Sequence, residues 1–274
     1  NEFLLAMNGE VAITEGEQVP KMKPIVGQFQ VKEREVYLTM QLSNFYSNRG
    51  GLGQNLRIGE AEEVLAEYTT SIIISYFVNG CVFITGLFSL LLSMLNRRSK
   101  DELLFALFCI VVAIRSIYAR PFTHTVTVFE LPWVTAVKIE SICTLLLVLI
   151  GLIFCYDKFQ SLIAKSFMFG AYTILGLQIA VVLLMEPTVF QSMVPYVFVF
   201  ELMIVVYMIA GAINRKLYHH EDVSIHLFGF TIMICAAVHD LIVVLVGSEA
   251  PMILLYIVSI YVLLMVYKFS RQYT

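Results

Sequence analysis

Long runs of apolar residues dominate the chain from about residue 70 onward and recur seven times. A helix of about 20 apolar residues spans the roughly 30 Å hydrocarbon core of a bilayer. Within each run the apolar residues follow one another without alternating, which disfavours the strands of a membrane barrel. The pattern therefore predicts seven transmembrane helices within 69–270 and a tail stub at 271–274. The runs cover residues 70–95, 102–119, 133–155, 166–186, 194–213, 223–246 and 250–269.

The first 68 residues carry a different pattern. Val36, Leu38, Met40 and Leu42 alternate with polar residues, which is typical of a half-buried strand. The apolar run at 3–7 ends at Asn8-Gly9, a pair that favours a hairpin turn. These signals predict a β-rich segment over 1–68. A β-domain with so few strands buries little surface on its own. We therefore expect a partial sandwich whose first half lies upstream.

Composition supports a membrane protein. The 274 residues are 59% hydrophobic and 14% charged, whereas a soluble domain is about 25% charged. The net charge of −3 gives no general attraction to nucleic acid. The cysteines all lie within apolar runs, where they are interpreted as small hydrophobic residues: Cys81, Cys109, Cys143, Cys155 and Cys235.

Charge in the connecting segments predicts the orientation. Segments 96–101, 157–165 and 214–222 and the end of the chain carry nine Lys and Arg residues, whereas the three alternate segments carry Arg120 alone. Positive loops stay in the cytoplasm. The first 68 residues are therefore expected outside and the C-terminus inside.

Six ionisable residues stand out within the predicted spans, where a charge is costly. At 1.5 Å per residue they lie about 7–11 Å beneath the outer surface, in one layer. Two positions apart on a helix, Lys138 and Glu140 point in nearly opposite directions, and Lys138 is expected to reach back to the surface. We define the outer polar layer as the other five residues: Arg115, Glu140, Glu201, His239 and Asp240.

Within this layer, Glu140 and Asp240 are the strongest inward candidates, with Arg115 as their counter-ion. Two interpretations stay open: a bond network that only holds helices together, and a ligand site or switch. Ion transport is disfavoured because the inner halves of the spans are almost entirely apolar. No HExxH, GxSxG, P-loop or CxxC motif occurs, so no catalytic residue, metal or cofactor is predicted. Asn79-Gly80 and Gly86 in the first span are expected to allow close helix packing.

Several short motifs resemble one family. Ser43-Asn44-Phe45, residues 49–52 and Ile58-Gly59 before the first span resemble the end of the extracellular domain of bacterial seven-transmembrane receptors with diverse intracellular signalling modules. Within the spans, residues 104–106 with Arg115 are similar to that family's membrane region, as are 138–140 and 239–241. The resemblance implies a jelly-roll outer domain similar to carbohydrate-binding modules.

The resemblance also implies a function. A receptor of this kind lies in the bacterial inner membrane, senses a small molecule, with carbohydrate one candidate, and signals to a cytoplasmic histidine kinase or diguanylate cyclase. Its partners are then the lipid bilayer, the unidentified ligand, an effector domain beyond this chain and, as one option, a second copy in a homodimer. The alternatives are a transporter or channel subunit, which would need a continued polar path and an internal repeat, and an intramembrane enzyme.

Overall fold

A computed structural model gives the arrangement of the chain. It describes residues 4–21, 25–31, 34–47, 56–95, 100–118, 131–158, 164–214, 221–246 and 253–273. Half of the Lys and Arg residues whose charge predicted the orientation lie outside these ranges, and so does the motif at 49–52.

Each predicted apolar run is helical, which confirms the mainly α fold class. The helices begin and end within a few residues of the runs, except that α1 begins earlier, at Ala61, and α6 begins at Pro187. Proline is favoured at a first helical position because its missing N–H needs no partner there. The long helices among the described residues are α1 (Ala61–Leu95), α2 (Lys100–Tyr118), α4 (Trp133–Lys158), α5 (Lys165–Leu184), α6 (Pro187–Asn214), α7 (Glu221–Val246) and α8 (Leu254–Tyr273).

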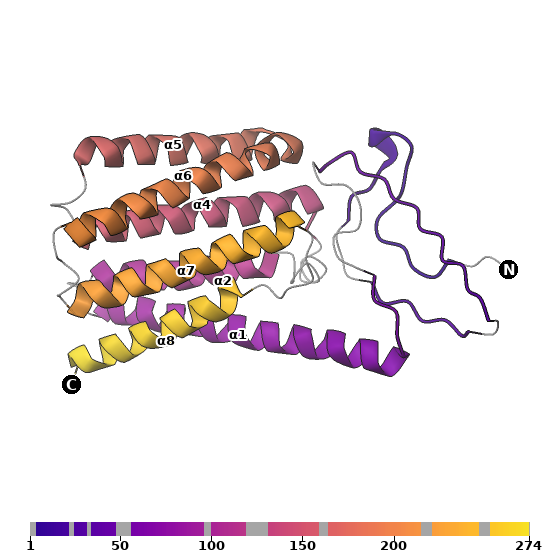
Figure 1. Cartoon of the computed structure of the whole chain (residues 1–274), viewed down its shortest axis with the longest axis horizontal. Helices are drawn as coiled ribbons and strands as arrows, with labels where there is room; N and C mark the ends of the chain where they lie inside the picture. The colour runs from indigo at the N-terminus through magenta and orange to yellow at the C-terminus, as the bar shows by residue number, and fades with distance from the viewer. Residues whose placement is uncertain are drawn as a thin grey trace.

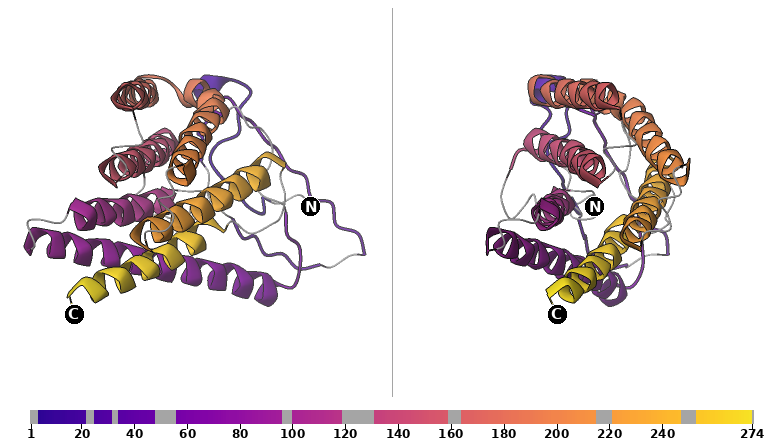
Figure 2. Two further views of the ribbon diagram at one scale, coloured as in Figure 1. Left: turned by 60° about the vertical axis from the view of Figure 1, so that its left-hand side comes forward. Right: turned by 90° about the vertical axis from the view of Figure 1, so that its left-hand side faces the viewer.

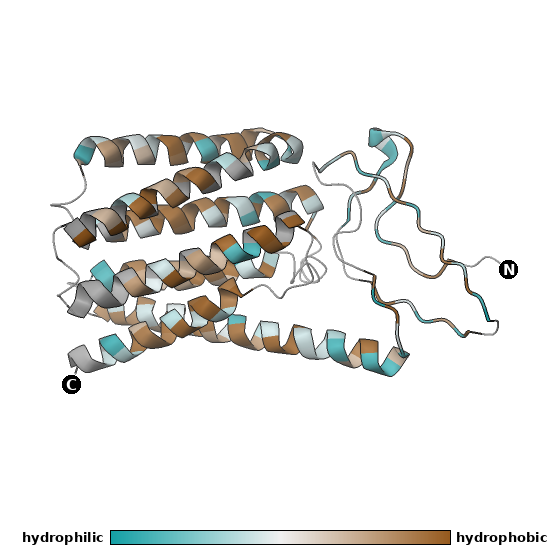
Figure 3. Cartoon of the chain, viewed as in Figure 1, coloured by the Kyte–Doolittle hydropathy of each residue, from teal (hydrophilic) through white to brown (hydrophobic). Residues whose placement is uncertain are grey.

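Three described helical stretches are long and apolar enough to cross a bilayer, namely Ala61–Leu95, Trp133–Phe154 and Lys165–Leu184. Helix α2 is less apolar because charged residues lie at both of its ends. Large side chains such as Phe77 and Leu263 are about 70% exposed on the outside of the bundle. Figure 3 shows the helices apolar over most of their surface. A helix that is apolar all round favours an apolar environment. Seven crossings stay a prediction.

The helices form two layers, as Figures 1 and 2 show. Helices α1, α2, α4 and α5 lie side by side in chain order, and the α1–α2 and α2–α4 interfaces are the most extensive. Helix α6 packs back against α4 and α5, while α8 packs against α7 and α1. The N- and C-termini lie at opposite ends of the bundle (Figure 1). We call the end that faces the N-terminal segment the outer end, and the other the inner end.

Two apolar cores hold the bundle. One joins α4, α5 and α6 around Leu152, Leu175 and Phe190. The other joins α1, α2, α7 and α8 around Val82, Cys109 and Met265. Gly86 brings α1 close to α2, since a Cβ there would lie 2.9 Å from Cys109 Cβ. Gly80 makes no such approach, because a Cβ there would meet nothing within 4 Å.

The β-rich character of the N-terminal segment is not confirmed. Among its described residues a single antiparallel bridge forms, between Glu10 and Val19, and a short 3-10 helix spans Glu15–Glu17. Gly9 takes a left-handed φ of 72° just before the bridge. The alternating residues from Val36 to Leu42 are extended but unpaired with any described strand, and their apolar side chains are exposed. An alternating strand needs a sheet to cover its apolar face, and the described residues provide none.

Candidate functional site

Asp240 on α7 caps the outer end of α8. Its Oδ1 accepts a hydrogen bond from the N–H of Ile253 at 2.8 Å, and its Oδ2 accepts one from the N–H of Leu254 at 3.0 Å. The first N–H groups of a helix have no partner within it, and its N-terminus attracts negative charge. One carboxylate therefore stabilises the first turn of α8 and ties that turn to α7.

His239 completes the surroundings of this carboxylate. Its Nδ1 lies 3.0 Å from Asp240 Oδ1, and its side chain is 39% exposed, whereas that of Asp240 is 15% exposed. In the tautomer with a proton on Nδ1, the imidazole donates a third hydrogen bond to the same carboxylate. His239 thus lies between Asp240 and the surroundings of the bundle.

Arg115 and Glu140 lie together at the outer end of the α2–α4 interface. Arg115 Nε donates to Thr144 Oγ1 at 2.8 Å, and this hydroxyl donates to the backbone carbonyl of Glu140 at 2.9 Å. The Cys143 thiol lies within electrostatic range of both Arg115 and Glu140. The group links α2 to α4.

Lys138 points away from this group. Its Nζ donates to the backbone carbonyl of Leu183 at 2.9 Å, in the last turn of α5. The last carbonyls of a helix lack partners within it, so an ammonium group is favourable there. Lys138 therefore contacts α5, whereas the backbone carbonyl of Glu140 accepts from Thr144 in the group with Arg115.

The outer polar layer thus contains two described groups. Arg115 and Glu140 belong to α2 and α4, whereas His239 and Asp240 join α7 to α8. Within the described part of the chain, Arg115 and Asp240 form no ion pair with each other. The side chain of Glu201 lies outside the described residues. A single network of all five residues, and any ligand bound by it, stay predictions.

The sequence marked Asn79 only as a position of close helix approach, and the structure shows that it is a buried polar contact on α1. Asn79 is 6% exposed and donates from Nδ2 to the carbonyl of Ala113 at 3.2 Å. It belongs to a stripe of small and polar side chains that α1 presents to α2. The spacing of that stripe in the sequence, one small residue every three or four positions, could have indicated it. The stripe consists of Ser75, Asn79, Val82, Gly86 and Ser89.

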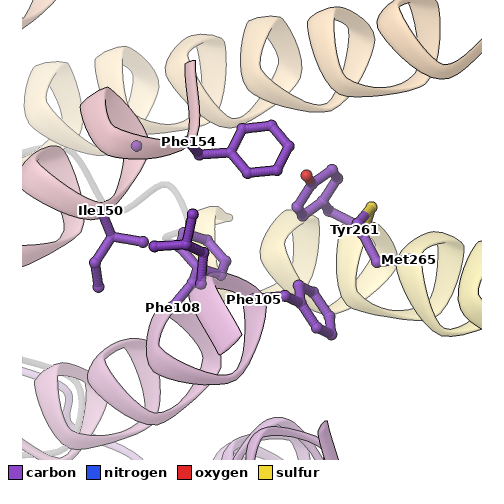
Figure 4. A pocket seen from close by; sticks show the side chains of 8 residues that line it. Phe105, Phe108, Ile150, Phe154, Tyr261 and Met265 are labelled. Carbon is purple, nitrogen blue, oxygen red and sulfur yellow. The ribbon is translucent and has the colours of Figure 1, made fainter. Parts of the chain in front are cut away.

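An apolar cavity of about 30 Å³ lies in the inner half of the bundle, between α8 and the α2–α4 pair. Phe154 and Tyr261 point toward each other across it in Figure 4. Apolar side chains make up nearly all of its wall. The lining residues are Leu104, Phe105 and Phe108 on α2, Ile150, Gly151 and Phe154 on α4, and Tyr261 and Met265 on α8.

Tyr261 fits between α7 and α2. A Cβ at Gly229 of α7 would lie 2.3 Å from the Cδ2 and Cε2 atoms of the tyrosine ring, so only glycine fits there. On its other side the ring meets Phe108 edge-on, with the centroids 6.3 Å apart. Gly229 therefore sets how closely α8 approaches α7. Glycine is common where transmembrane helices pack closely. The place of Gly229 in the contact between α7 and α8 was not evident from the sequence.

The described residues offer no group of three His, Cys, Asp or Glu side chains that could hold a metal ion. They instead contain hydrogen bonds that join the ends of neighbouring helices, and the interior of the bundle is apolar. Such hydrogen bonds position the helices relative to one another. They suit a bundle that transmits a change of arrangement from one end to the other.

Comparison with known proteins identifies the chain. No curated protein and no solved structure matches it. A family model described as 7TM diverse intracellular signalling matches residues 71–272, which begin within α1 and end at the last turn of α8. This family comprises membrane sensory receptor domains, and the match confirms the family that the sequence motifs resembled. The chain belongs to the family of seven-transmembrane receptors with diverse intracellular signalling modules.

Proposed function

We propose that this chain is the membrane core of a sensory receptor in the bacterial inner membrane. It crosses the bilayer seven times, with residues 1–68 outside and the end of α8 in the cytoplasm. It relays the binding of an extracellular small molecule, with carbohydrate one candidate class, to a cytoplasmic effector. The effector is a histidine kinase or a diguanylate cyclase, in two-component or cyclic-di-GMP signalling. The observation that carries the proposal is the family match across the helical bundle.

Contacts at the outer end support a relay. In the N-terminal segment the Gln18 side chain donates to the carbonyl of Ser43 at 2.6 Å and accepts from the N–H of Phe45 at 2.9 Å. A few residues on, the Ser47 hydroxyl donates to Gln191 Oε1 in the first turns of α6 at 3.1 Å. A change in the N-terminal segment can therefore reach α6 directly through this hydrogen bond.

The Asp240 cap supports the choice of α8 as the output element. Helix α8 begins at this cap at the outer end and finishes at the inner end, where the C-terminus lies (Figure 1). A ligand that displaces α7 or competes for the Asp240 carboxylate changes the balance between two positions of α8. A ligand shifts such a balance only by its difference in affinity for the two states.

The apolar cavity weighs against the transporter and channel alternatives. A transport path needs polar side chains or water along its length. In the described inner half of the bundle, the space between α8 and the α2–α4 pair is lined by apolar groups.

Orientation is testable with reporter fusions in bacteria. Alkaline phosphatase is active only outside the cytoplasm, and green fluorescent protein exported through the general pathway fluoresces only inside. We expect fluorescence from a fusion at Thr274 and phosphatase activity from a fusion after Glu186, between α5 and α6. Phosphatase activity at Thr274 would overturn the proposed topology.

The signalling role is testable in the full reading frame with its native effector. We expect Asp240→Asn to change effector output at equal protein abundance. Glu186→Gln removes an acidic charge from an exposed position at the same end and serves as the matched control. Equal output from both variants and the unaltered receptor would remove Asp240 from the signalling path. A reading frame with no effector would overturn the receptor proposal itself.

A further inference from the structure

We infer that an ordered water molecule binds within the α1–α2 interface, where it donates a hydrogen bond to the side-chain oxygen of Asn79 and bonds to the hydroxyl groups of Ser75 and Ser116. The inference does not depend on the proposed receptor function. It combines a buried acceptor that no described group serves, two buried hydroxyl groups on the same side of it, and small side chains around it.

The acceptor is the side-chain oxygen of Asn79. This residue is 6% exposed, and its Nδ2 donates to the backbone carbonyl of Ala113 at 3.2 Å. Its Oδ1 is buried as well, and among the described residues no group donates a hydrogen bond to it. A buried acceptor without a donor costs free energy, so nearly all such atoms have a protein group or an ordered water as partner. We therefore expect a donor at Oδ1.

Ala113 fixes the direction of the Asn79 amide. A backbone carbonyl only accepts hydrogen bonds, so it must face the NH2 end of the amide. Rotation of the amide by half a turn would set two acceptors against each other, which excludes the opposite assignment. Oδ1 therefore points away from the Ala113 carbonyl, to a side where no described donor reaches it.

Two buried hydroxyl groups lie on the outer side of this contact. Ser75 precedes Asn79 by four residues on α1, and Ser116 follows Ala113 by three residues on α2, so each lies about 5–6 Å away on the same helix face. The two helices run antiparallel, so both steps lead toward the outer end. The two serines are 9% and 6% exposed. A water beside Oδ1 is therefore within reach of both hydroxyl groups.

These hydroxyl groups are available to a bound water. A serine or threonine hydroxyl in a helix often donates to the backbone carbonyl four residues earlier. Within the described part of the chain Ser75 and Ser116 make no such bond, so each hydroxyl can turn to donate or accept. A buried water makes about three hydrogen bonds, and Oδ1 with the two hydroxyls supplies that number. The hydroxyls that do bond to the carbonyl four residues earlier are those of Thr85, Ser141, Thr144, Thr173 and Ser259.

The packing of α1 favours a water over a direct contact at this position. The neighbouring side chains, those of Ala113 and the two serines, are small. A Cβ at Gly80, next to Asn79, would meet nothing within 4 Å. Further inward a Cβ at Gly86 would lie 2.9 Å from Cys109 Cβ. Helix α1 is thus packed less tightly beside Asn79 than at Gly86.

Water-edited solid-state NMR on the full chain in lipid bilayers tests the site. Magnetisation starts on water and passes to labelled asparagine and alanine side chains, and it reaches those in contact with water first. The Asn79 signal is identified by its loss in Asn79→Leu. We expect transfer to buried Asn79 to be nearly as fast as transfer to exposed Asn44. Ala106, which is 0% exposed on α2, gives the slow rate of a site without water.

Two serine variants locate the water. Ser116→Ala removes one of its three partners, so we expect a partial loss of the transfer to Asn79. Ser89→Ala is the matched control, because Ser89 is a buried serine on the same stripe of α1 but lies ten residues from Asn79. That spacing is about 15 Å along the helix, so this variant should leave the transfer unchanged.

Each outcome decides the inference. Fast transfer to Asn79 that Ser116→Ala reduces and Ser89→Ala leaves unchanged supports the water site. Transfer to Asn79 as slow as transfer to Ala106 would overturn it, and this comparison is made in the unaltered protein, so it holds even where a variant fails to fold. Equal transfer in the two serine variants would also overturn it. Because no ligand or effector enters the measurement, either result leaves the receptor proposal to be judged on effector output.

Discussion

Removal of the Asp240 carboxylate should destabilise the outer end of α8 and measurably lower the free energy of unfolding. Asp240→Ala leaves the N–H groups of Ile253 and Leu254 without their acceptor and removes a negative charge from the N-terminus of the helix. Asp240→Asn keeps the shape and one carbonyl oxygen. That oxygen can accept from one N–H, while the amide NH2 then faces the other.

The magnitude follows from these two bonds. A hydrogen bond to a charged group contributes about 1.5–3 kcal/mol, and loss of an N-terminal cap costs about 0.5–2 kcal/mol. The two figures describe overlapping effects and are not added. We expect the free energy of unfolding to fall by about 2–4 kcal/mol for Asp240→Ala and by about 1–2 kcal/mol for Asp240→Asn.

Unfolding of the purified protein in mixed micelles by increasing fractions of denaturing detergent, followed by circular dichroism, measures these differences. Glu186→Ala provides the control, because it removes an exposed acidic side chain that only precedes the first turn of α6, and it should change stability by less than about 1 kcal/mol. The reasoning is refuted if Asp240→Ala unfolds with the same midpoint as the control. It is also refuted if the asparagine variant is less stable than the alanine variant.

Three further predictions concern helix contacts, and the same unfolding measurement checks each. Gly229→Ala should lower the free energy of unfolding by about 1–3 kcal/mol, because its methyl group overlaps the Tyr261 ring. Tyr261→Leu in the same chain should restore part of that loss. Strictly additive effects of the two substitutions would contradict the contact. Gly86→Val should cost at least as much by forcing α1 from α2, whereas wild-type stability would show that the close approach is absent. Arg115→Gln and Thr144→Val should show a coupling of about 0.6 kcal/mol, up to about 1.7, in a double-mutant cycle, and zero coupling would remove their hydrogen bond.

The positions of the helices followed from the sequence because one physical constraint dominates. In hydrocarbon a backbone must satisfy its own hydrogen bonds, so a long apolar run becomes a helix whatever its neighbours are. The direction of the Lys138 side chain toward the outer end of the bundle also followed from the sequence, since a long lysine side chain can reach back to the surface. Lys138 reaches the carbonyl of Leu183, as expected of a side chain directed to the surface.

The partners of Asp240 could not be predicted in the same way. Its acceptor oxygens bind backbone N–H groups, which every residue except proline carries, so no residue type in the sequence marks them. The sequence favoured Arg115 as the counter-ion because charge is visible in a sequence and a helix end is not. The cavity escaped prediction for a related reason, since it depends on how eight side chains fall short of filling a space. The expected strand at 36–42 depended on a covering sheet, which local alternation cannot supply.

Helix α1 has 35 residues and reaches beyond the other helices toward the N-terminal segment (Figure 1). At 1.5 Å per residue it is about 52 Å long, whereas hydrocarbon takes up about 30 Å. Its first turns carry Glu62 and Glu63, and Glu67 pairs with Arg57 in the chain that enters the helix. In the proposed orientation this surplus forms a rigid stalk that holds the N-terminal segment above the headgroups. Its length sets the standoff, so deletion of whole turns would lower the segment toward the lipid surface.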